Sequence, residues 1–376
     1  MQYSGLSPGA QLAYDTILRK KTDGVPSAWI NVMEHSMIER FAGVSEGTYR
    51  KEPEETYLAF QKAIGACILD QWIPCNPLTM AEKGYKNREK GATTGAEHIE
   101  VDGVTIDSPE SVVEHMESIA FPKLKKAAED FNGETRVRQL IEQEKQIQDL
   151  FGPDILKTGY GFIRFPTLAY NIYGYVHYFM AYALYPDVIE THFRLQADYW
   201  VLHNTAAARA YTQADLPPLF RLDHDMADSK GTLVDVKSLD RIWFPHFERS
   251  IEPLVKAGVN LMWHCDGNLM DMVPRLIECG VNGFQGFQYE AGMDYTKICS
   301  MKDREGNSLH IKAGVSVTTT LPHGTPDEVK KELKFLAENG PDTGLFLGAS
   351  SSVTPGVPYK NLKTLVEGFQ FYREKK

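Results

Sequence analysis

The sequence of 376 residues lacks the marks of a membrane or secreted protein. It has no run of about 18 apolar residues, the length that a transmembrane helix requires. The stretch from Met1 to Leu12 lacks the basic start and apolar core of a secretory signal. Its five cysteines are an odd number with no CxxC pair, so no disulfide framework is expected. These absences predict a cytoplasmic protein without a membrane partner.

Basic charge is also scarce. The 40 Lys and Arg residues are outnumbered by 50 Asp and Glu residues, which gives a net charge of −10. A nucleic acid partner is not expected, because no basic stripe is present to displace counterions. Neither GxGxxG nor GxxxxGK[ST] occurs, so nucleotide-dependent chemistry lacks its usual motifs. The rest of the composition, 43% hydrophobic and 24% charged, suits one large α/β barrel or two modest domains.

Short apolar runs alternate with helix-like stretches along most of the chain. This pattern predicts an α/β protein in which each strand feeds a helix. Closure into a (β/α)8 TIM barrel with an N-terminal helical extension is favoured over an open doubly wound sheet. The eight predicted strands are Ser27–Val32, Asp70–Pro74, Phe162–Phe165, Leu219–Leu222, Asn260–Trp263, Gly283–Phe287, Leu309–Val315 and Gly344–Leu347.

Residues 78–158 do not fit one barrel unit. They contain a polar loop at Glu82–Gly95, a predicted hairpin at His98–Ile106 and one or two charged helices. Asp102 and Gly103 have the composition of the hairpin turn. We interpret the segment as an inserted cap over the barrel mouth. No Pro/Gly-rich linker is visible, so residues 1–376 are predicted to form a single domain.

Several helix starts are also readable. Pro186 and Asp187 are expected to open one helix, Ser238 to cap another, and Pro358 to begin the last. Thr325 and Glu328 are spaced as a capping box, with proline at the first helical position.

The richest candidate for chemistry is the predicted strand end at His264 and Asp266. Residues two apart on a strand point the same way, so these two share a face and Cys265 faces away. In a TIM barrel the carboxyl ends of the strands carry the active site. A histidine and a carboxylate there form a two-ligand metal platform. The alternative is a hydrogen-bonded histidine beside an aspartate that caps the next helix.

Other predicted strand ends carry polar residues as well. Convergence at one rim makes them candidates together, although each alone is unremarkable. They are Asn31, Asn76, Asp223, Asp225, Gln288, Glu290 and Ser350 to Ser352.

An aromatic segment, Tyr170–Phe179, follows the third predicted strand. Its tyrosines, Tyr170, Tyr173 and Tyr178, would form a pocket wall for a flat ring. A buried helix with its aromatic stripe in the core explains the same pattern equally well.

Beyond these separate signals, the chain resembles the uroporphyrinogen decarboxylase superfamily over nearly its whole length. The resemblance is diffuse in any one window, but its order and spacing are specific from about residue 220 to 361. It rests on Ile38–Gly43, Arg221–Gly231 with Pro245, Lys256–Val259, His264-x-Asp266-Gly267-Asn268, Gln288–Asp294, Leu321–Pro326 and Pro355–Asn361.

The superfamily contains porphyrinogen decarboxylases and corrinoid-dependent methyltransferases. Decarboxylases of the family grip substrate carboxylates with arginines near the N-terminus, whereas the matching region here, Trp29–His35, contains none. This departure argues against uroporphyrinogen as the substrate. Members that methylate thiols bind zinc through one His and two Cys. The resemblance places His264, Asp266 and Ser351 at those positions, so both soft thiolates are replaced by oxygen groups.

The resemblance therefore implies a methyltransferase component of an O-demethylase. It would move a methyl group from a small methoxylated, aromatic substrate to the Co(I) corrinoid of a partner protein. Zinc held by His264, Asp266 and Glu290 is one expectation, with Asp225 or Asp223 as alternatives to Glu290. Acid or hydrogen-bond chemistry by His264, Asp266 and Asp225 without metal is the other. Substrate contacts are expected from Asn31, Tyr170, Tyr173, Tyr178 and Gln288, and a homodimer is possible.

Two other functions stay open at this point. One is a decarboxylase or lyase acting on another small acid, with Asp225 and His264 transferring protons. The other is a catalytically silent barrel that binds a corrinoid or porphyrin.

Overall fold

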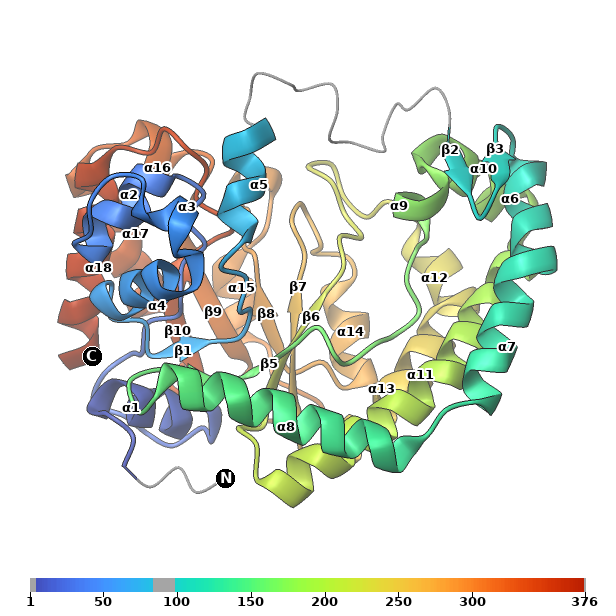
Figure 1. Ribbon diagram of the computed structural model, residues 1–376, viewed down its shortest axis with the longest axis horizontal. Helices are drawn as coiled ribbons and strands as arrows, with labels where there is room; N and C mark the ends of the chain where they lie inside the picture. Colours follow the sequence, from blue (N-terminus) through green and yellow to red (C-terminus); the bar gives the residue numbers. More distant parts are fainter. Residues whose placement is uncertain (1–4, 84–98, 375–376) are drawn as a thin grey trace.

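The computed structural model describes residues 5–83 and 99–374, and a curled parallel β-sheet forms its centre (Figure 1). Six strands pair in the order β10-β9-β8-β7-β6-β5, and β1 pairs with β4 in a second parallel ladder. The strands are β1 (Ile68–Leu69), β4 (Leu156–Lys157), β5 (Gly159–Tyr160), β6 (Leu219–Asp223), β7 (Asn260–His264), β8 (Gly283–Gln285), β9 (His310–Val315) and β10 (Leu345–Ala349).

Single bridges connect the two ladders. Ser27 pairs with Leu347 of β10, and Ala28 pairs with Ile68 of β1. One residue, Thr158, separates β4 from β5. The expected parallel, TIM-like α/β sheet is therefore confirmed, whereas these ladders do not show a continuous closed barrel.

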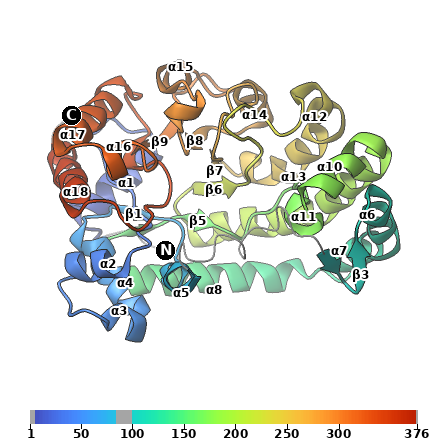
Figure 2. The ribbon, with the colours of Figure 1, turned by 90° about the horizontal axis from the view of Figure 1, so that it is seen from above.

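Helices surround the sheet on its outer side, as the view from above shows (Figure 2). The long helix α11 packs on both α13 and α8. The helices are α1 (Pro8–Ile17), α2 (His35–Ala42), α3 (Thr48–Lys51), α4 (Pro53–Ala63), α5 (Asn76–Lys83), α6 (Pro109–His115), α7 (Phe121–Glu129), α8 (Gly133–Phe151), α9 (Tyr170–Tyr173), α10 (Tyr175–Leu184), α11 (Pro186–Ala214), α12 (Val236–Ile242), α13 (Phe244–Lys256), α14 (Val273–Cys279), α15 (Tyr295–Ser300), α16 (Thr320–His323), α17 (Pro326–Asn339) and α18 (Tyr359–Glu374).

The N-terminal helix α1 seals one end of the sheet. Its buried face, which includes Ala13 and Ile17, joins an apolar cluster with Leu219, Met262 and Phe346 of the strands. Burial of such side chains is favourable by roughly 25 cal/mol per Å² of apolar surface. Helix α1 therefore packs its apolar face against these strand side chains.

The segment between β1 and β4 contains the predicted hairpin. Strands β2 (Ile99–Val101) and β3 (Val104–Ile106) pair antiparallel. Asp102 and Gly103 have φ values of 52° and 81°, the positive values that a tight two-residue hairpin turn requires. Helix α8 runs below the hairpin along α11 (Figure 1). The predicted polar loop Glu82–Gly95 falls outside the described residues from position 84 onward.

Two predicted strands are displaced in the structure. Phe162–Phe165 is not a strand, because the side chain of Asn204 satisfies its backbone: Arg164 N donates to Asn204 Oδ1 at 3.1 Å, and Asn204 Nδ2 donates to Arg164 O at 2.6 Å. The pairing segments lie earlier, in β4 and β5. Asp70–Pro74 is likewise replaced by β1, just before it, and the backbone N of Gln71 donates to the Asp70 side chain at 2.7 Å.

Two smaller predictions also change. Ser27–Val32 pairs only through isolated bridges rather than as a strand. Ser238 does not cap α12, because Asp235 precedes the helix and its side chain accepts a bond from Ser238 N. The capping box of Thr325 and Glu328 is confirmed at the start of α17.

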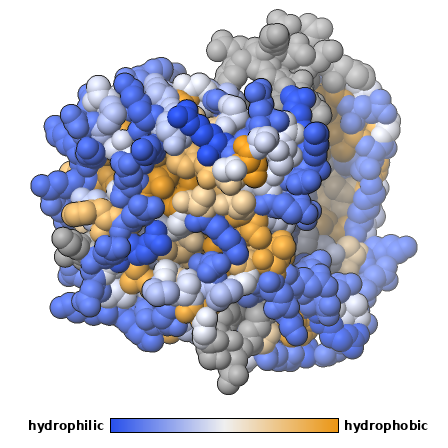
Figure 3. All heavy atoms as spheres, turned by 60° about the vertical axis from the view of Figure 1, so that its left-hand side comes forward, coloured by the Kyte–Doolittle hydropathy of each residue, from blue (hydrophilic) through white to orange (hydrophobic). Residues whose placement is uncertain are grey.

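The outer surface is mixed in character. Figure 3 shows apolar side chains gathered in the middle of one face, with polar ones around them. Within the described ranges, no helix combines the length and apolar character needed to cross a membrane.

Candidate active site

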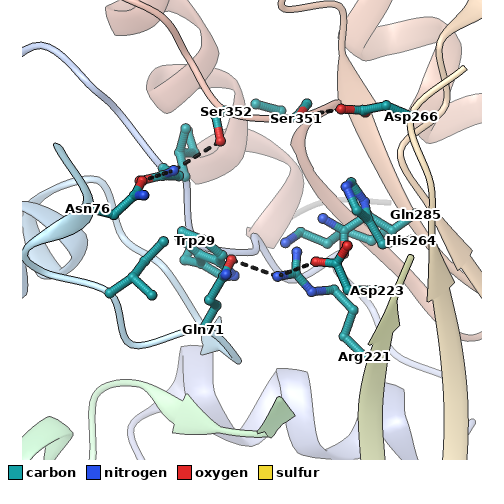
Figure 4. Close-up of a pocket in the computed structure, with 15 residues that line it drawn as sticks. Trp29, Gln71, Asn76, Arg221, Asp223, His264, Asp266, Gln285, Ser351 and Ser352 are labelled. Carbon is teal, nitrogen blue, oxygen red and sulfur yellow. Dashed lines mark hydrogen bonds and ion pairs between the residues drawn. The ribbon is translucent and has the colours of Figure 1, made fainter. Parts of the chain in front are cut away.

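A cavity of about 250 Å³ lies at the carboxyl ends of the strands. The last residues of β6, β7, β8 and β10 all line it, which is the position expected for an active site in a TIM-like fold. His264, Gln285 and Asp223 face it from one side, and Trp29, Gln71 and Asn76 from the other (Figure 4). The remaining lining residues are Ile30, Asn31, Ile73, Arg221, Asp266, Lys312, Ala349, Ser351 and Ser352.

Arg221 organises the deeper part of the cavity. Its guanidinium pairs with Asp70 (Nε to Oδ2, 3.3 Å) and with Asp223 (Nη2 to Oδ2, 3.5 Å). It also donates to Gln71 Oε1 at 2.6 Å. Asp70 in turn accepts from the indole N–H of Trp29. These contacts join the two sides of the cavity, so the positions of Trp29 and Gln71 depend on one buried cation.

The charges of this network reinforce each other. Burial alone would raise the pKa of Asp70, but the cations of Arg221 and Lys312 and the bond from Trp29 hold it below its usual value. Burial alone would lower the pKa of Arg221, but Asp70 and Asp223 raise it above its usual value. Both groups therefore stay ionised at neutral pH.

Four polar residues form one row across neighbouring strands. In the sheet register Asp223 pairs with His264, His264 with Gln285, and Gln285 with Lys312. All four line the cavity. We call these residues the polar row. Parallel strands lie about 4.8 Å apart, so the row offers a nitrogen- or oxygen-bearing group at each step around the wall.

His264 ends β7 and is held by close packing. The neighbouring Gly286 has φ of 87°, and a Cβ atom there would lie 2.9 Å from His264 Nδ1, so only glycine fits this position. His264 Nδ1 is buried without a hydrogen-bond partner among the described residues. Burial lowers the pKa of His264 to about 4, so the ring is neutral at pH 7.

Asp266 lies two residues further, toward the mouth. Its carboxylate accepts from Ser351 Oγ at 3.4 Å, and its backbone N donates to Asp225 Oδ1 at 2.9 Å. Burial, with Asp225 nearby, raises the pKa of Asp266 to about 6. Burial also raises the pKa of Asp225. Asp266 therefore exchanges its proton only about one pH unit below neutrality, and its protonated form can donate to a ligand oxygen.

Asn31 and Asn76 are brought together at the opposite side of the mouth. Asn31 Nδ2 donates to Asn76 Oδ1 at 3.0 Å and to Ser352 Oγ at 2.9 Å (Figure 4). Asn31 Oδ1 is buried and has no hydrogen-bond partner in the described parts of the chain. This oxygen is available to a ligand.

Other predicted site residues lie behind the cavity wall. Asp225 holds the backbone of Asp266, and Gln288 Oε1 accepts from Gly267 N at 2.9 Å. Both therefore shape the turn that follows β7. Glu290 accepts a hydrogen bond from Thr318. None of these three side chains lines the cavity.

The predicted aromatic wall also lies elsewhere. Tyr173 and Tyr178 are 2% and 0% exposed, and Tyr173 Oη bonds His115 Nδ1 at 2.9 Å. Tyr170 donates to the backbone O of Asp225 at 2.7 Å. These tyrosines pack the core between α9, α10 and the inserted segment rather than lining the cavity.

The expected zinc ligands do not fit a metal in this arrangement. Among residues 5–83 and 99–374, no three or more His, Cys, Asp or Glu side chains are grouped closely enough to hold one. Glu290 accepts a hydrogen bond from Thr318, and its side chain does not line the cavity that His264 and Asp266 line.

Several cavity residues were missed by the sequence interpretation. Arg221 and Lys312 supply cations to the cavity although the region Trp29–His35 contains no arginine. A usable signal was present: Lys312 interrupts the predicted apolar strand Leu309–Val315, and a charge inside a buried strand is unusual. Trp29 and Gln71 gave no such signal. Their side chains are held at the cavity by hydrogen bonds to Asp70 and Arg221, which the sequence pattern does not reveal.

Comparison with known proteins supports the fold. No model of a known protein family matches the sequence, and no curated protein matches it. Among solved structures, the chain is similar to a methyltransferase from Methanosarcina mazei, with a TM-score of 0.54 and 16% identity over 97% of this chain and 98% of that one. A Listeria monocytogenes protein described as a candidate vitamin-B12-independent methionine synthase has a TM-score of 0.43 and 12% identity, over 92% and 96%. The chain thus has a fold that a methyltransferase also adopts.

Proposed function

We propose that this chain transfers a methyl group from a small methoxylated aromatic compound to the corrinoid of a partner protein. The observation that carries the proposal is the meeting of His264 and Asp266 in one cavity at the strand ends. The fold shared with a methyltransferase is consistent with it. At about 250 Å³ the cavity is near the lower end of small-molecule sites, roughly 300–1,000 Å³, so it suits one ring rather than a porphyrinogen.

The residues of this chain would act on the ether oxygen. When the methyl–oxygen bond breaks, its electron pair stays on oxygen, and the methyl carbon joins the acceptor. The corrinoid, when bound, supplies the electron pair that forms the new bond to carbon. The developing negative charge on oxygen would meet the acid of Asp266 or an N–H of neutral His264, which stabilises it at the moment of transfer.

The surrounding residues would orient the substrate. Asn31 lines the same cavity as Asp266, and its Oδ1 has no hydrogen-bond partner among the described residues. The aromatic face of Trp29 is fixed by Asp70 and can lie against a substrate ring. The same proposal includes closure of the sheet as a barrel of the uroporphyrinogen decarboxylase type, supported by the single bridges of Ser27 and Ala28.

One observation favours a second candidate. The buried cations Arg221 and Lys312 line the cavity, and a decarboxylase needs such groups to hold a substrate carboxylate. A decarboxylase of a small acid is therefore the alternative.

Product analysis separates the two candidates. The protein is incubated with 4-methoxybenzoate and reduced cobalamin, either free or carried by a corrinoid protein, and the products are identified by mass spectrometry. The proposal predicts 4-hydroxybenzoate and methylcobalamin in equal amounts. Release of CO2 with formation of methoxybenzene would instead establish the alternative.

A further inference from the structure

Three neighbouring members of the polar row are buried, and two of them carry a buried polar atom with no hydrogen-bond partner among the described residues. Lys312, Gln285 and His264 are only 6%, 7% and 9% exposed. Within the described part of the chain, neither the ammonium of Lys312 nor the amide of Gln285 makes a hydrogen bond or ion pair, and Gln285 Oε1 and His264 Nδ1 are buried and unpaired. Buried polar groups are nearly always hydrogen-bonded in folded proteins. Two adjacent exceptions, Gln285 Oε1 and His264 Nδ1, line one cavity together with Lys312, and they indicate a surface built for a polar ligand.

The charged groups around Lys312 indicate that it would bind an anion. Arg221 is already paired with Asp70 and Asp223. Asp70 also accepts hydrogen bonds from the indole N–H of Trp29 and from the backbone N of Gln71. Within the described residues no carboxylate forms an ion pair with Lys312, although Asp70 is near enough to act on its charge; Lys312 Nζ lies 5.0 Å from the centre of the Trp29 ring.

Lys312 is also held where a ligand can reach it. It lies in the middle of β9, beside Gln285 of β8 in the register, and its side chain lines the cavity. A lysine ammonium donates only, and a glutamine amide both donates and accepts. Donors on adjacent strands, about 4.8 Å apart, match the two oxygens of a carboxylate.

We infer that Lys312 and Gln285 form an anion subsite that binds the carboxylate of the methyl donor. The inference rests on the proposed function and deepens it, because it assigns the substrate to the methoxylated aromatic carboxylic acids. Asp266 lies two residues beyond the end of β7 and lines the same cavity as the polar row. A small aromatic acid would place its carboxylate at Lys312 and direct its methoxy oxygen toward Asp266.

The charge state of Lys312 supplies an independent readout. Burial lowers the pKa of Lys312 to about 8; Asp70 acts in the opposite direction, and Arg221 adds to the lowering. The other ionisable groups of the polar row are Asp223 and the neutral His264. The ammonium form binds an anion, so preference for the anion should fall as the pH rises through about 8.

The test compares 4-methoxybenzoate with its uncharged analogue 4-methoxybenzamide by calorimetry. The unmodified protein should bind the acid about 10–100-fold more tightly than the amide, the value of a charge-assisted hydrogen bond. Lys312→Met should lose this preference. Lys297→Met is the matched control, because it removes one charge from an exposed position on α15 and should keep the preference.

If Lys312→Met fails to fold, as judged by circular dichroism, the pH dependence of binding to the unmodified protein tests the subsite instead. Its acid-to-amide preference should shrink between pH 7 and pH 9. An unchanged preference over this range, a preference retained in folded Lys312→Met, or no difference in binding between the two probes would overturn the subsite.

Failure of the subsite is distinguishable from failure of the proposed function. Equal methyl transfer from acid and amide would remove the subsite and leave the methyltransferase. Binding of the acid that depends on Lys312, without methyl transfer from either compound, would leave the subsite and remove the methyltransferase.

Discussion

Asp70 is the acidic partner on which the deeper part of the cavity depends, and its removal has a calculable cost. Asp70→Ala would leave the buried Arg221 with only the partly exposed Asp223 as a counter-charge. Breaking a buried pair by removing one partner costs about 3–5 kcal/mol. The substitution would also leave the indole N–H of Trp29 and the backbone N of Gln71 without their hydrogen-bond acceptor. Asp70→Asn keeps an acceptor for one of them, so its cost should be clearly smaller.

The pH dependence of this effect has a definite sign. The pKa of Asp70 is depressed in the folded state. Its stabilisation is therefore fully present above the ordinary aspartate value of about 3.9, and it is lost as the pH falls through the lower folded value. The difference in the free energy of unfolding between the unmodified protein and Asp70→Ala should therefore become smaller as the pH falls.

Urea denaturation of three proteins tests the reasoning. Asp70→Ala should lower the free energy of unfolding by about 3–5 kcal/mol at pH 7, while the exposed Asp271→Ala should change it by less than about 0.5 kcal/mol. A loss below about 1 kcal/mol in Asp70→Ala would refute the assignment of Asp70 as the main partner of a buried cation.

Three further variants probe other parts of the account. Cys265→Ala should lower thermal stability and leave methyl transfer intact, because Cys265 lies outside the cavity and bonds Met226 N and Asp266 O; a large loss of turnover in a folded variant would contradict this. Tyr173→Phe should cost about 1 kcal/mol of stability through the lost bond to His115, with unchanged ratios in a substrate panel; altered ratios would restore it as a pocket residue. Thr325→Ala should cost about 1 kcal/mol in thermal melts by removing the cap of α17, and no change would argue against the capping box.

The fold was largely predictable because hydrophobic runs determine it. Five predicted strands, from Leu219 onward, correspond to β6 to β10. Asp70–Pro74 and Phe162–Phe165 were displaced because polar side chains hydrogen-bond to their backbone, and Ser27–Val32 pairs only through isolated bridges. The side-chain amide of Asn204, 40 residues away, makes hydrogen bonds with both the backbone N and the backbone O of Arg164. No short-range signal reveals such a contact.

The site was predictable only in part, for a related reason. His264, Asp266 and Asn31 were identified because strand ends converge at one rim in this fold. Lys312 and Gln285 lie within or at the end of strands that read as apolar, and their importance depends on register with His264. The tyrosines of Tyr170–Phe179 show the opposite case, since their spacing fits a core helix and a pocket wall equally well.

The most direct test of the central claim is methyl transfer itself. The protein is mixed with 4-methoxybenzoate and reduced cobalamin, free or carried by a corrinoid protein, and methylcobalamin is followed by its absorbance. The account predicts methylation that depends on this chain, with the rate reduced roughly 100-fold or more in His264→Ala and in Asp266→Ala. Methylation at near-normal rates in both folded variants would contradict the assignment of the site, and no methylation by the unmodified protein would contradict the function.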